Sequence, residues 1–150
     1  MQTKNKMSDV KILLTYKAED GSYQVESVWA TKEGEYYRID NIPFLAANVA
    51  LYDLVTAEMD DGQLYFDELI QASGHSTIQM IIYKESELQQ ITSELEKLGC
   101  AWEGSHIKTL IAIDVPKDTD YSLIEEYLES GERANRWSYK EACMAHDIER

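Results

Sequence analysis

The chain is poor in the features that mark disulfide-rich, secreted and membrane-spanning proteins. Its two cysteines among 150 residues, Cys100 and Cys143, lie far apart in a pattern unlike a disulfide framework. No apolar run approaches the roughly 20 residues that a membrane-spanning helix needs. The N-terminal segment carries lysines with no apolar stretch behind them, so we expect no secretory signal. These absences predict a cytoplasmic protein without a membrane partner.

Cationic residues are also scarce. The sequence has 14 Lys and Arg against 28 Asp and Glu, which gives a formal net charge of −14. Phosphate backbones and anionic lipids are bound chiefly through Lys and Arg, so we expect no direct nucleic-acid partner. The same field favours encounter with a basic protein surface. Acidity can also serve solubility alone, and composition leaves both interpretations open.

Motifs that hold phosphates or metals are missing as well. The sequence has no glycine-rich phosphate loop and none of the common hydrolase signatures. Cys143 and His146 have the i, i+3 spacing of two metal ligands on a helix, but a structural zinc site needs four ligands. A buried Cys143 beside a surface His146 is the simpler interpretation. We therefore expect no metal and no cofactor.

Short segments rich in β-branched and aromatic residues fill the first half. Pro43 cannot donate to a sheet ladder and predicts a bend after the third of these segments. Tight connections between the segments favour a small antiparallel sheet or a partial barrel. Alternation and turn signals predict five strands, at residues 10–16, 23–29, 36–39, 53–59 and 63–70.

Apolar residues at helical spacing occur only in the second half of the sequence. An apolar stripe predicts a helix that begins with a capping box formed by Ser86 and Gln89 and ends at Gly99. Gly131 is expected to end a second helix. The predicted elements are, in order, strand 77–83, helix 86–98, strand 101–103, strand 107–115, helix 122–130 and helix 138–147.

Together the two halves predict an α+β protein. The N-terminal antiparallel β-sheet or partial barrel would pack on a C-terminal β-α-β-β-α-α part, which is compatible with a ferredoxin-like plait. We place a disordered tail at residues 1–9, a β-rich subdomain at 10–75 and an α/β subdomain at 76–150. No linker rich in Gly, Ser or Pro separates the halves, so we expect them to pack together.

Several short motifs resemble one bacterial family. They are Glu26-Ser-Val-Trp29, Tyr37-Arg-Ile-Asp-Asn-Ile-Pro-Phe44, Asp53-Leu-Val, Ser73-Gly-His-Ser-Thr77 and Leu98-Gly-Cys100. The family is domain of unknown function 4265, and the resemblance runs from about Val25 to the Trp137-Ser-Tyr139 region. It implies a compact bacterial protein and carries over no catalytic residues. Some families of that profile are immunity proteins, which neutralise toxins delivered by neighbouring cells.

The Ser73–Thr77 loop is the most enzyme-like segment of the sequence. His75 could act as a general base near neutral pH, and the hydroxyls of Ser73, Ser76 and Thr77 could be nucleophiles. Residues adjacent in sequence seldom reach the hydrogen-bonded arrangement that nucleophilic catalysis needs. We therefore favour a turn in which Gly74 takes a positive φ and Ser76 or Thr77 bonds nearby backbone. A small-ligand or partner contact is the functional alternative for this loop.

Carboxylates crowd one short stretch of the second half. It lacks the residue spacing of a calcium loop, so two interpretations are open: helix capping with a solvated face, or a negative docking surface. Tyrosines on strands of the first half are candidate interface anchors, because alternation turns some of them outward. The residues predicted to bind a partner are Asp118, Asp120, Glu125, Glu126, Glu129, Glu132, Tyr36 and Tyr65.

The leading hypothesis is an acidic protein-binding module, most simply an immunity protein that binds and occludes a cognate toxin with a basic surface. The net charge of −14 and the lack of an assembled catalytic motif motivate it. One alternative is a regulatory protein that binds a small ligand between the Ser73–Thr77 loop and the bend at 41–44. The other is an enzyme of unrecognised type centred on His75.

Overall fold

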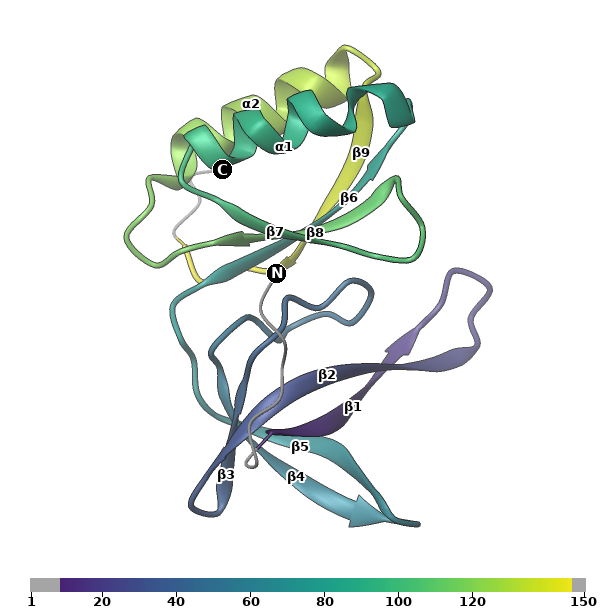
Figure 1. The fold of residues 1–150 in the computed structure, drawn as a ribbon, viewed down its shortest axis with the longest axis vertical. Coiled ribbons are helices and arrows are strands. Elements are labelled where there is room, and N and C mark those ends of the chain that lie inside the picture. Colours follow the sequence, from purple (N-terminus) through teal and green to yellow (C-terminus); the bar gives the residue numbers. More distant parts are fainter. Residues whose placement is uncertain (1–8, 147–150) are drawn as a thin grey trace.

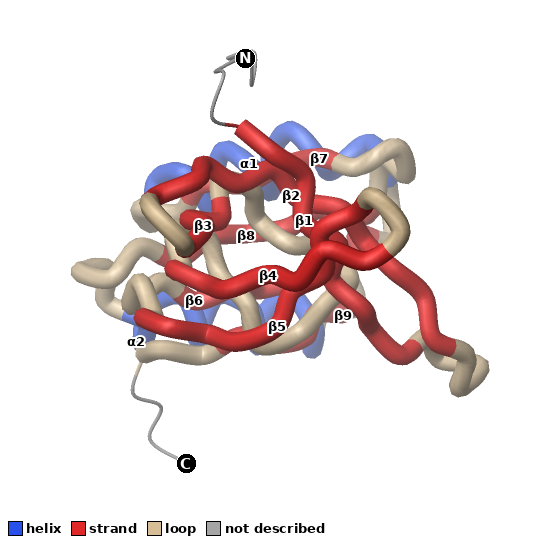
Figure 2. The backbone as a smooth tube through the Cα atoms, turned by 90° about the horizontal axis from the view of Figure 1, so that it is seen from below, coloured by secondary structure: helices blue, strands red, loops and turns tan. Residues whose placement is uncertain are grey.

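Two β-sheets and two helices are stacked in layers. The computed structural model describes residues 9–146. A small barrel forms one end, a four-stranded sheet lies in the middle, and both helices cover the far side of that sheet (Figure 1). Seen from the barrel end, the helices lie behind the strands (Figure 2). The predicted α+β class is confirmed. Neither helix within residues 9–146 is long and apolar enough to cross a membrane.

The barrel is a five-stranded meander closed by its first and last strands. The strands are β1 (Asp9–Lys17), β2 (Tyr23–Glu33), β3 (Tyr36–Ile39), β4 (Leu54–Asp60) and β5 (Gln63–Gln71). Consecutive strands pair antiparallel, and a short parallel contact between β1 and β5 closes the ring. The predicted antiparallel sheet of the first half is confirmed. The predicted tail at 1–9 lies outside the described residues except for Asp9, which begins β1.

Period-two alternation decides which side chains the barrel encloses. Ile12 of β1 stands opposite Val28 of β2, and both are buried together with Leu14 and Ala30. The intervening residues of β1, such as Thr15, face outward, as the pleat of a strand requires. Burying each large aliphatic side chain contributes about 1.5–3 kcal/mol, so this inner row stabilises the barrel.

The middle sheet and the helices come from the second half of the chain. The strands are β6 (Ser76–Ile82), β7 (Ala101–Gly104), β8 (Leu110–Val115) and β9 (Trp137–Cys143). One turn of 3-10 helix at Glu85–Glu87 leads into α1 (Leu88–Lys97), and α2 (Tyr121–Arg133) follows β8. The strand order is β7-β8-β6-β9 with every neighbour antiparallel. The element order is therefore β-α-β-β-α-β.

The helices bury the apolar stripes that the sequence predicts. Ile91 and Leu95 of α1 are fully buried in one cluster with Ile124 and Leu128 of α2. The end of α1 is also as predicted, because Gly99 follows the helix with φ +98, a conformation that costs little only for glycine.

The predicted third helix at 138–147 is wrong, because residues 137–143 form the edge strand β9. Trp137 pairs with Ile82 and Tyr139 with Met80, so both aromatic side chains point to the helix-covered face of the sheet. Trp137 is fully buried there. The two aromatic residues are two positions apart, which is the period of a strand and not of a helix.

The predicted capping box at the start of α1 is also wrong. Ser86 lies in the 3-10 turn, and Glu87 occupies the N-cap position of α1 without a side-chain hydrogen bond. A 3-10 turn shifts the register of the first helical residues, so Ser86 and Gln89 are not placed to cap one another.

The strand predicted from residue 107 begins only at Leu110. The hydroxyl oxygen of Ser105 lies 2.8 and 3.0 Å from the carbonyl oxygens of Ile107 and Leu110, which share its one proton, and this contact holds the intervening residues in a turn. Ile107 is half exposed as a result. Serine side chains compete with sheet ladders in this way.

The predicted end of the second helix at Gly131 is wrong as well, since α2 continues to Arg133. Gly131 is buried inside the helix, where a Cβ atom would lie 1.9 Å from Cζ2 of Trp137. The glycine therefore serves the close approach of α2 to β9 rather than the end of the helix. Asn135, with φ +60, turns the chain after α2.

Candidate functional site

The segment between β3 and β4 lies where the barrel meets the middle sheet, and we call this junction the seam. Glu26 of β2 anchors the segment from the barrel side. Its carboxylate accepts hydrogen bonds from the backbone N–H groups of Phe44, Leu45 and Ala46 at 2.6, 3.0 and 2.9 Å. Three N–H donors on one carboxylate form a strong, charge-assisted arrangement. The bend after Pro43 is therefore fixed by a residue 18 positions earlier.

The same segment is held from the side of the middle sheet. Asn41 accepts from the backbone N–H of Trp29 at 2.6 Å and donates through Nδ2 to Glu103 of β7 at 3.2 Å. The other oxygen of Glu103 accepts from the backbone N–H of Ile42 at 3.0 Å. Polar side chains of both halves thus bind the two layers together at the seam.

A second network fixes the Ser73–Thr77 loop against the segment that precedes β4. Asp53, which is 2% exposed, accepts from the backbone N–H groups of Ala50 at 2.9 Å and Ser73 at 2.8 Å. The Ser73 hydroxyl donates to the carbonyl of Leu51 at 2.7 Å and accepts from the backbone N–H of His75 at 3.1 Å. Ser73 therefore has its hydrogen-bonding capacity committed to backbone groups.

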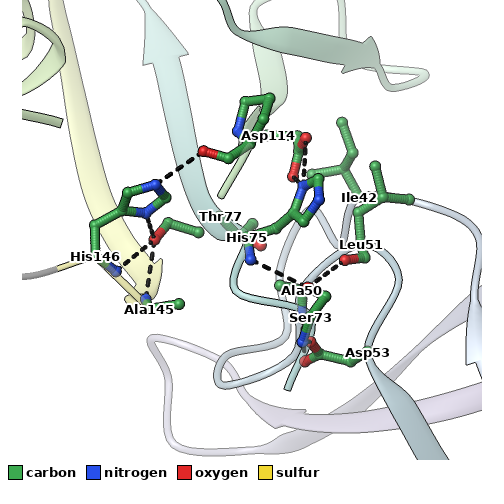
Figure 3. Close-up of polar contacts among 12 residues, drawn as sticks. Ile42, Ala50, Leu51, Asp53, Ser73, His75, Thr77, Asp114, Ala145 and His146 are labelled. Atoms are coloured by element: carbon green, nitrogen blue, oxygen red, sulfur yellow. Dashed lines mark hydrogen bonds and ion pairs between the residues drawn. The ribbon is translucent and has the colours of Figure 1, made fainter. Parts of the chain in front are cut away.

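His75 points from this loop onto Asp114 of β8 (Figure 3). Nδ1 of His75 lies 2.9 and 3.0 Å from the two carboxylate oxygens, and Asp114 is 2% exposed. Burial raises the pKa of Asp114, and the nearby imidazoles of His75 and His146 act in the opposite direction. Tyr52 contacts the His75 ring edge-on, with the ring centroids 5.2 Å apart. The other imidazole nitrogen of His75 has no hydrogen-bond partner among residues 9–146.

A separate pair is formed by Ser76, the first residue of β6, and His146, whose ring is labelled in Figure 3. Nε2 of His146 lies 2.9 Å from the carbonyl oxygen of Pro116 and can only donate to it. Nδ1 must then accept from the Ser76 hydroxyl, whose oxygen also accepts from the backbone N–H of Ala145 at 2.9 Å. Ser76 has no exposed surface, so no substrate can reach this hydroxyl. The His146 ring stacks on Tyr121, with the centroids 5.7 Å apart.

The arrangement around His75 has part of the geometry of a general base. A carboxylate orients the ring from Nδ1, as an orienting acid does in hydrolases. The nearby hydroxyls are committed elsewhere, however: Ser73 to Leu51, Ser76 to His146, and the buried Thr77 to the carbonyl of Val49 at 3.3 Å. Within residues 9–146 the structure therefore brings no nucleophile to the outer nitrogen of His75.

The Ser73–Thr77 loop matches its prediction in one respect and differs in another. Gly74 has φ +90, as a turn at this position requires, and a Cβ there would meet the side chain of Lys117 at 2.9 Å. Ser76 and Thr77 do not bond nearby backbone. They belong to β6 and hydrogen-bond to residues far along the chain, because the loop is packed between both layers.

The predicted partner-binding residues fall into two groups at opposite ends of the molecule. Tyr36 and Tyr65 lie on β3 and β5 of the barrel, and the carboxylates lie on α2 and the loop before it (Figure 1). Asp120 is the N-cap of α2 and accepts from the backbone N–H of Ser122 at 3.0 Å. The exposed carboxylates are Asp118, Asp120, Glu126 and Glu132, and the half-buried ones are Glu125 and Glu129.

The potential metal ligands do not come together. Among residues 9–146 no three His, Cys, Asp or Glu side chains are placed to hold a metal ion. Cys143 and His146 are both half-buried, and His146 is committed to Ser76 and Pro116. Burial raises the pKa of Cys143 to about 11 and that of Cys100 to about 12, so both thiols stay protonated near neutral pH.

Several residues that build the seam are missed by the sequence interpretation. Asp114 carries a detectable signal, because a carboxylate inside an apolar strand needs a partner to be buried. Glu26 lies in a recognised motif, but its contacts with the bend depend on the path of the chain between β3 and β4. Glu103 and Gln79 have no local signal, since their partners lie on the other layer.

Comparisons with known proteins agree with this architecture. The family model described as "Domain of unknown function (DUF4265)" matches residues 26–139. A crystal structure of a hypothetical protein from Neisseria gonorrhoeae is similar to the chain, with 25% sequence identity and a TM-score of 0.83. That similarity covers 95% of this chain and 100% of the other. No curated protein matches the chain.

Proposed function

The chain belongs to the family of the domain of unknown function DUF4265, and we propose that it is an acidic protein-binding module. In this proposal it acts in the cytoplasm as an immunity protein that binds and occludes a toxin with a basic surface. The observation that carries the proposal is the row of carboxylates on α2 and the loop before it.

Carboxylates outnumber cations on this surface. Residues 117–133 contain six carboxylates and two cations, Lys117 and Arg133. Arg133 lies 3.7 Å from Glu129, but the Arg133 side chain is 71% exposed and that of Glu129 is 46% exposed, and ion pairs so open to solvent contribute little. A strongly negative field is therefore left over the outer side of α2, which speeds association with a positive partner.

An apolar side chain lies among these carboxylates. Leu123 is 55% exposed on α2, one turn before Glu126 and close in sequence to the N-cap Asp120. Interfaces commonly combine a desolvated apolar centre with a charged rim. Leu123 can supply such a centre, and the carboxylates can supply the rim.

The scaffold beneath α2 suits an inhibitor. Ile124, Leu128 and the buried Gly131 fix the helix on the middle sheet, so the carboxylates are presented without a large ordering cost on binding. An enzyme that acts on RNA or DNA needs a basic groove for phosphates. A rigid negative surface is complementary to such a groove, and this supports a toxin of that class as the partner.

Co-purification with the products of the adjacent genes tests the proposal. The tagged chain is expected to retain one of them in a complex that weakens as salt rises, because exposed charges are screened. If no neighbouring gene product binds, the immunity proposal fails.

Charge reversal locates the binding surface. The α2 variant carries Asp118→Lys, Glu126→Lys and Glu132→Lys. The control carries Glu58→Lys, Asp67→Lys and Glu68→Lys on β4 and β5, which changes the net charge equally on exposed barrel residues. We expect the α2 variant to bind at least about tenfold more weakly and the control to change by less than about threefold. Equal losses would mean that net charge, and not this surface, drives binding.

We also infer that β6–β9 with α1 and α2 form a ferredoxin-like plait. The element order β-α-β-β-α-β and the strand order β7-β8-β6-β9 support this assignment. In such a plait each helix joins two strands that are separated in the sheet by one other strand.

A further inference from the structure

A cavity of about 340 Å³ lies between the β1–β2 hairpin, the bend after Pro43 and the barrel-facing side of the middle sheet. Figure 1 shows the β1–β2 hairpin reaching out from the barrel. We call this space the hairpin cavity; its main walls are Tyr16, Lys17, Phe44, Leu45, Ile81 and Lys140. The volume is at the lower end of the range for small-molecule sites. It lies far from the α2 carboxylates, on the opposite face of the middle sheet, and does not depend on the proposed function.

The walls of the cavity are largely apolar and remain open to solvent. Ile81 of β6 and Leu45 of the bend are 50% and 42% exposed, and Phe44 and Tyr16 line the same space. Ile81 stands opposite Leu110 on β8, so the two side chains point to the same face of the sheet. An exposed apolar concavity of this kind gains stability when an apolar group fills it.

Polar side chains also line the hairpin cavity, next to its apolar walls. Gln79, which is 5% exposed, donates both Nε2 protons, to the carbonyl oxygens of Pro43 at 3.2 Å and Ala46 at 2.8 Å. Its Oε1 has no hydrogen-bond partner among residues 9–146, so it is available to accept from a ligand. Lys140 stands directly opposite Gln79 on β9, which brings its ammonium group to the same side of the sheet.

The cations at the cavity stand out in so acidic a chain. Lys17 and Lys140 both line the cavity, and neither forms an ion pair within the described part of the chain. Glu19 also lines it, which leaves two cationic residues against one acidic residue. The two lysines stabilise one negative charge on a ligand in the cavity. The net charge of −14 on the whole chain disfavours a ligand that carries a second negative charge.

From this arrangement we propose that the hairpin cavity binds a small amphipathic monocarboxylate. Its apolar body lies against Ile81 and Leu45, and its carboxylate lies between Lys17 and Lys140. An N–H or O–H group on the ligand donates to Oε1 of Gln79. The apolar walls and the orienting polar groups together have the composition of a small-molecule site.

Indole-3-acetate is a suitable probe, because it combines an aromatic body, one N–H donor and a single carboxylate. Titration followed by amide NMR shifts of the isotope-labelled chain should move resonances of β6, β9 and the β1–β2 hairpin. The neutral analogue indole-3-acetamide should bind about tenfold more weakly, since it lacks the charge. No shifts at about 5 mM probe, shifts confined to other surfaces, or equal binding of the amide would each overturn the proposal.

Matched variants test the individual walls. The double variant Lys17→Met and Lys140→Met should weaken binding of indole-3-acetate about fivefold to tenfold, whereas Lys108→Met should leave it unchanged. Ile81→Glu should abolish binding, and Ile107→Glu, at an equally exposed isoleucine away from the cavity, should not. An unchanged affinity in Ile81→Glu, with the fold confirmed by its amide spectrum, would refute the site.

Discussion

Replacing Gly131 by alanine should destabilise the protein, although alanine is the better helix former. The added Cβ would lie 1.9 Å from Cζ2 of Trp137 and 2.2 Å from both Cε2 and Cη2. Ordinary contacts begin near 3.4 Å, so the indole must retreat by more than about 1 Å. Trp137 is fully buried and donates from Nε1 to the carbonyl of Leu128 at 3.0 Å, and this hydrogen bond is lost when the ring moves.

Gly131→Ala combines two destabilising contributions to the free energy of unfolding with one stabilising contribution. Overpacking costs about 1–3 kcal/mol, and breaking a buried hydrogen bond costs about 1–3 kcal/mol more. The gain in helix propensity from glycine to alanine is about 1 kcal/mol. The net loss for Gly131→Ala is therefore about 1–5 kcal/mol, and a mid-range loss of about 3 kcal/mol corresponds to a drop of about 10 °C in Tm.

Urea denaturation followed by tryptophan fluorescence and circular dichroism measures this loss. Ser130→Ala, at the exposed neighbouring position of α2, serves as the control and should change stability by less than about 0.5 kcal/mol. In a Trp137→Leu background, Gly131→Ala should cost little, because the ring that it meets is gone. A single Gly131→Ala variant as stable as the wild type would refute the close packing of α2 on β9.

Three further predictions concern buried and charged groups. Burial raises the pKa of Asp114 above 3.8, so the folded chain holds this proton better than the unfolded chain. The difference in unfolding free energy between the wild type and Asp114→Asn, measured by denaturation at a series of pH values, should therefore change in favour of the variant as pH rises from 3.8 through the raised pKa. A difference that stays constant across that pH range would contradict this prediction. Glu26→Gln should lower the unfolding free energy by about 1–3 kcal/mol, because an amide replaces the carboxylate that accepts three backbone N–H groups, whereas Glu35→Gln at an exposed turn should not. Cys100 and Cys143, with pKa values raised to about 12 and about 11, should react with a thiol reagent at pH 8 only after denaturation, and rapid labelling of the native chain would show that they are not protected.

Elements with a strong local period could be predicted from the sequence. The barrel strands follow alternation and turn signals, and the stripe on α1 follows the helical period. The strand β9 stands where the sequence predicts a helix, because its aromatic alternation spans only Trp137 and Tyr139 and is too short to identify a strand. The role of Gly131 could not be predicted, since it depends on how closely Trp137 approaches from another element.

The candidate site was less predictable than the fold. The turn at Gly74 follows from local chemistry, but the partners of His75 and Ser76 lie 39 and 70 residues further along the chain. The partner of Glu26 lies on a segment with no regular structure. Such contacts depend on tertiary packing, and a single sequence carries no period or spacing that reveals them.

The central position of β6 has a consequence for how the chain is made. β6 pairs with β8 on one side and with β9 on the other, and β9 is the last strand of the described chain. While the polypeptide emerges from the ribosome, the barrel can close long before this sheet is complete. Until residues 137–143 have left the exit tunnel, one edge of β6 has no partner strand and the cluster under the helices lacks Trp137. A nascent chain stalled before that point would therefore expose an unpaired strand edge that chaperones can bind.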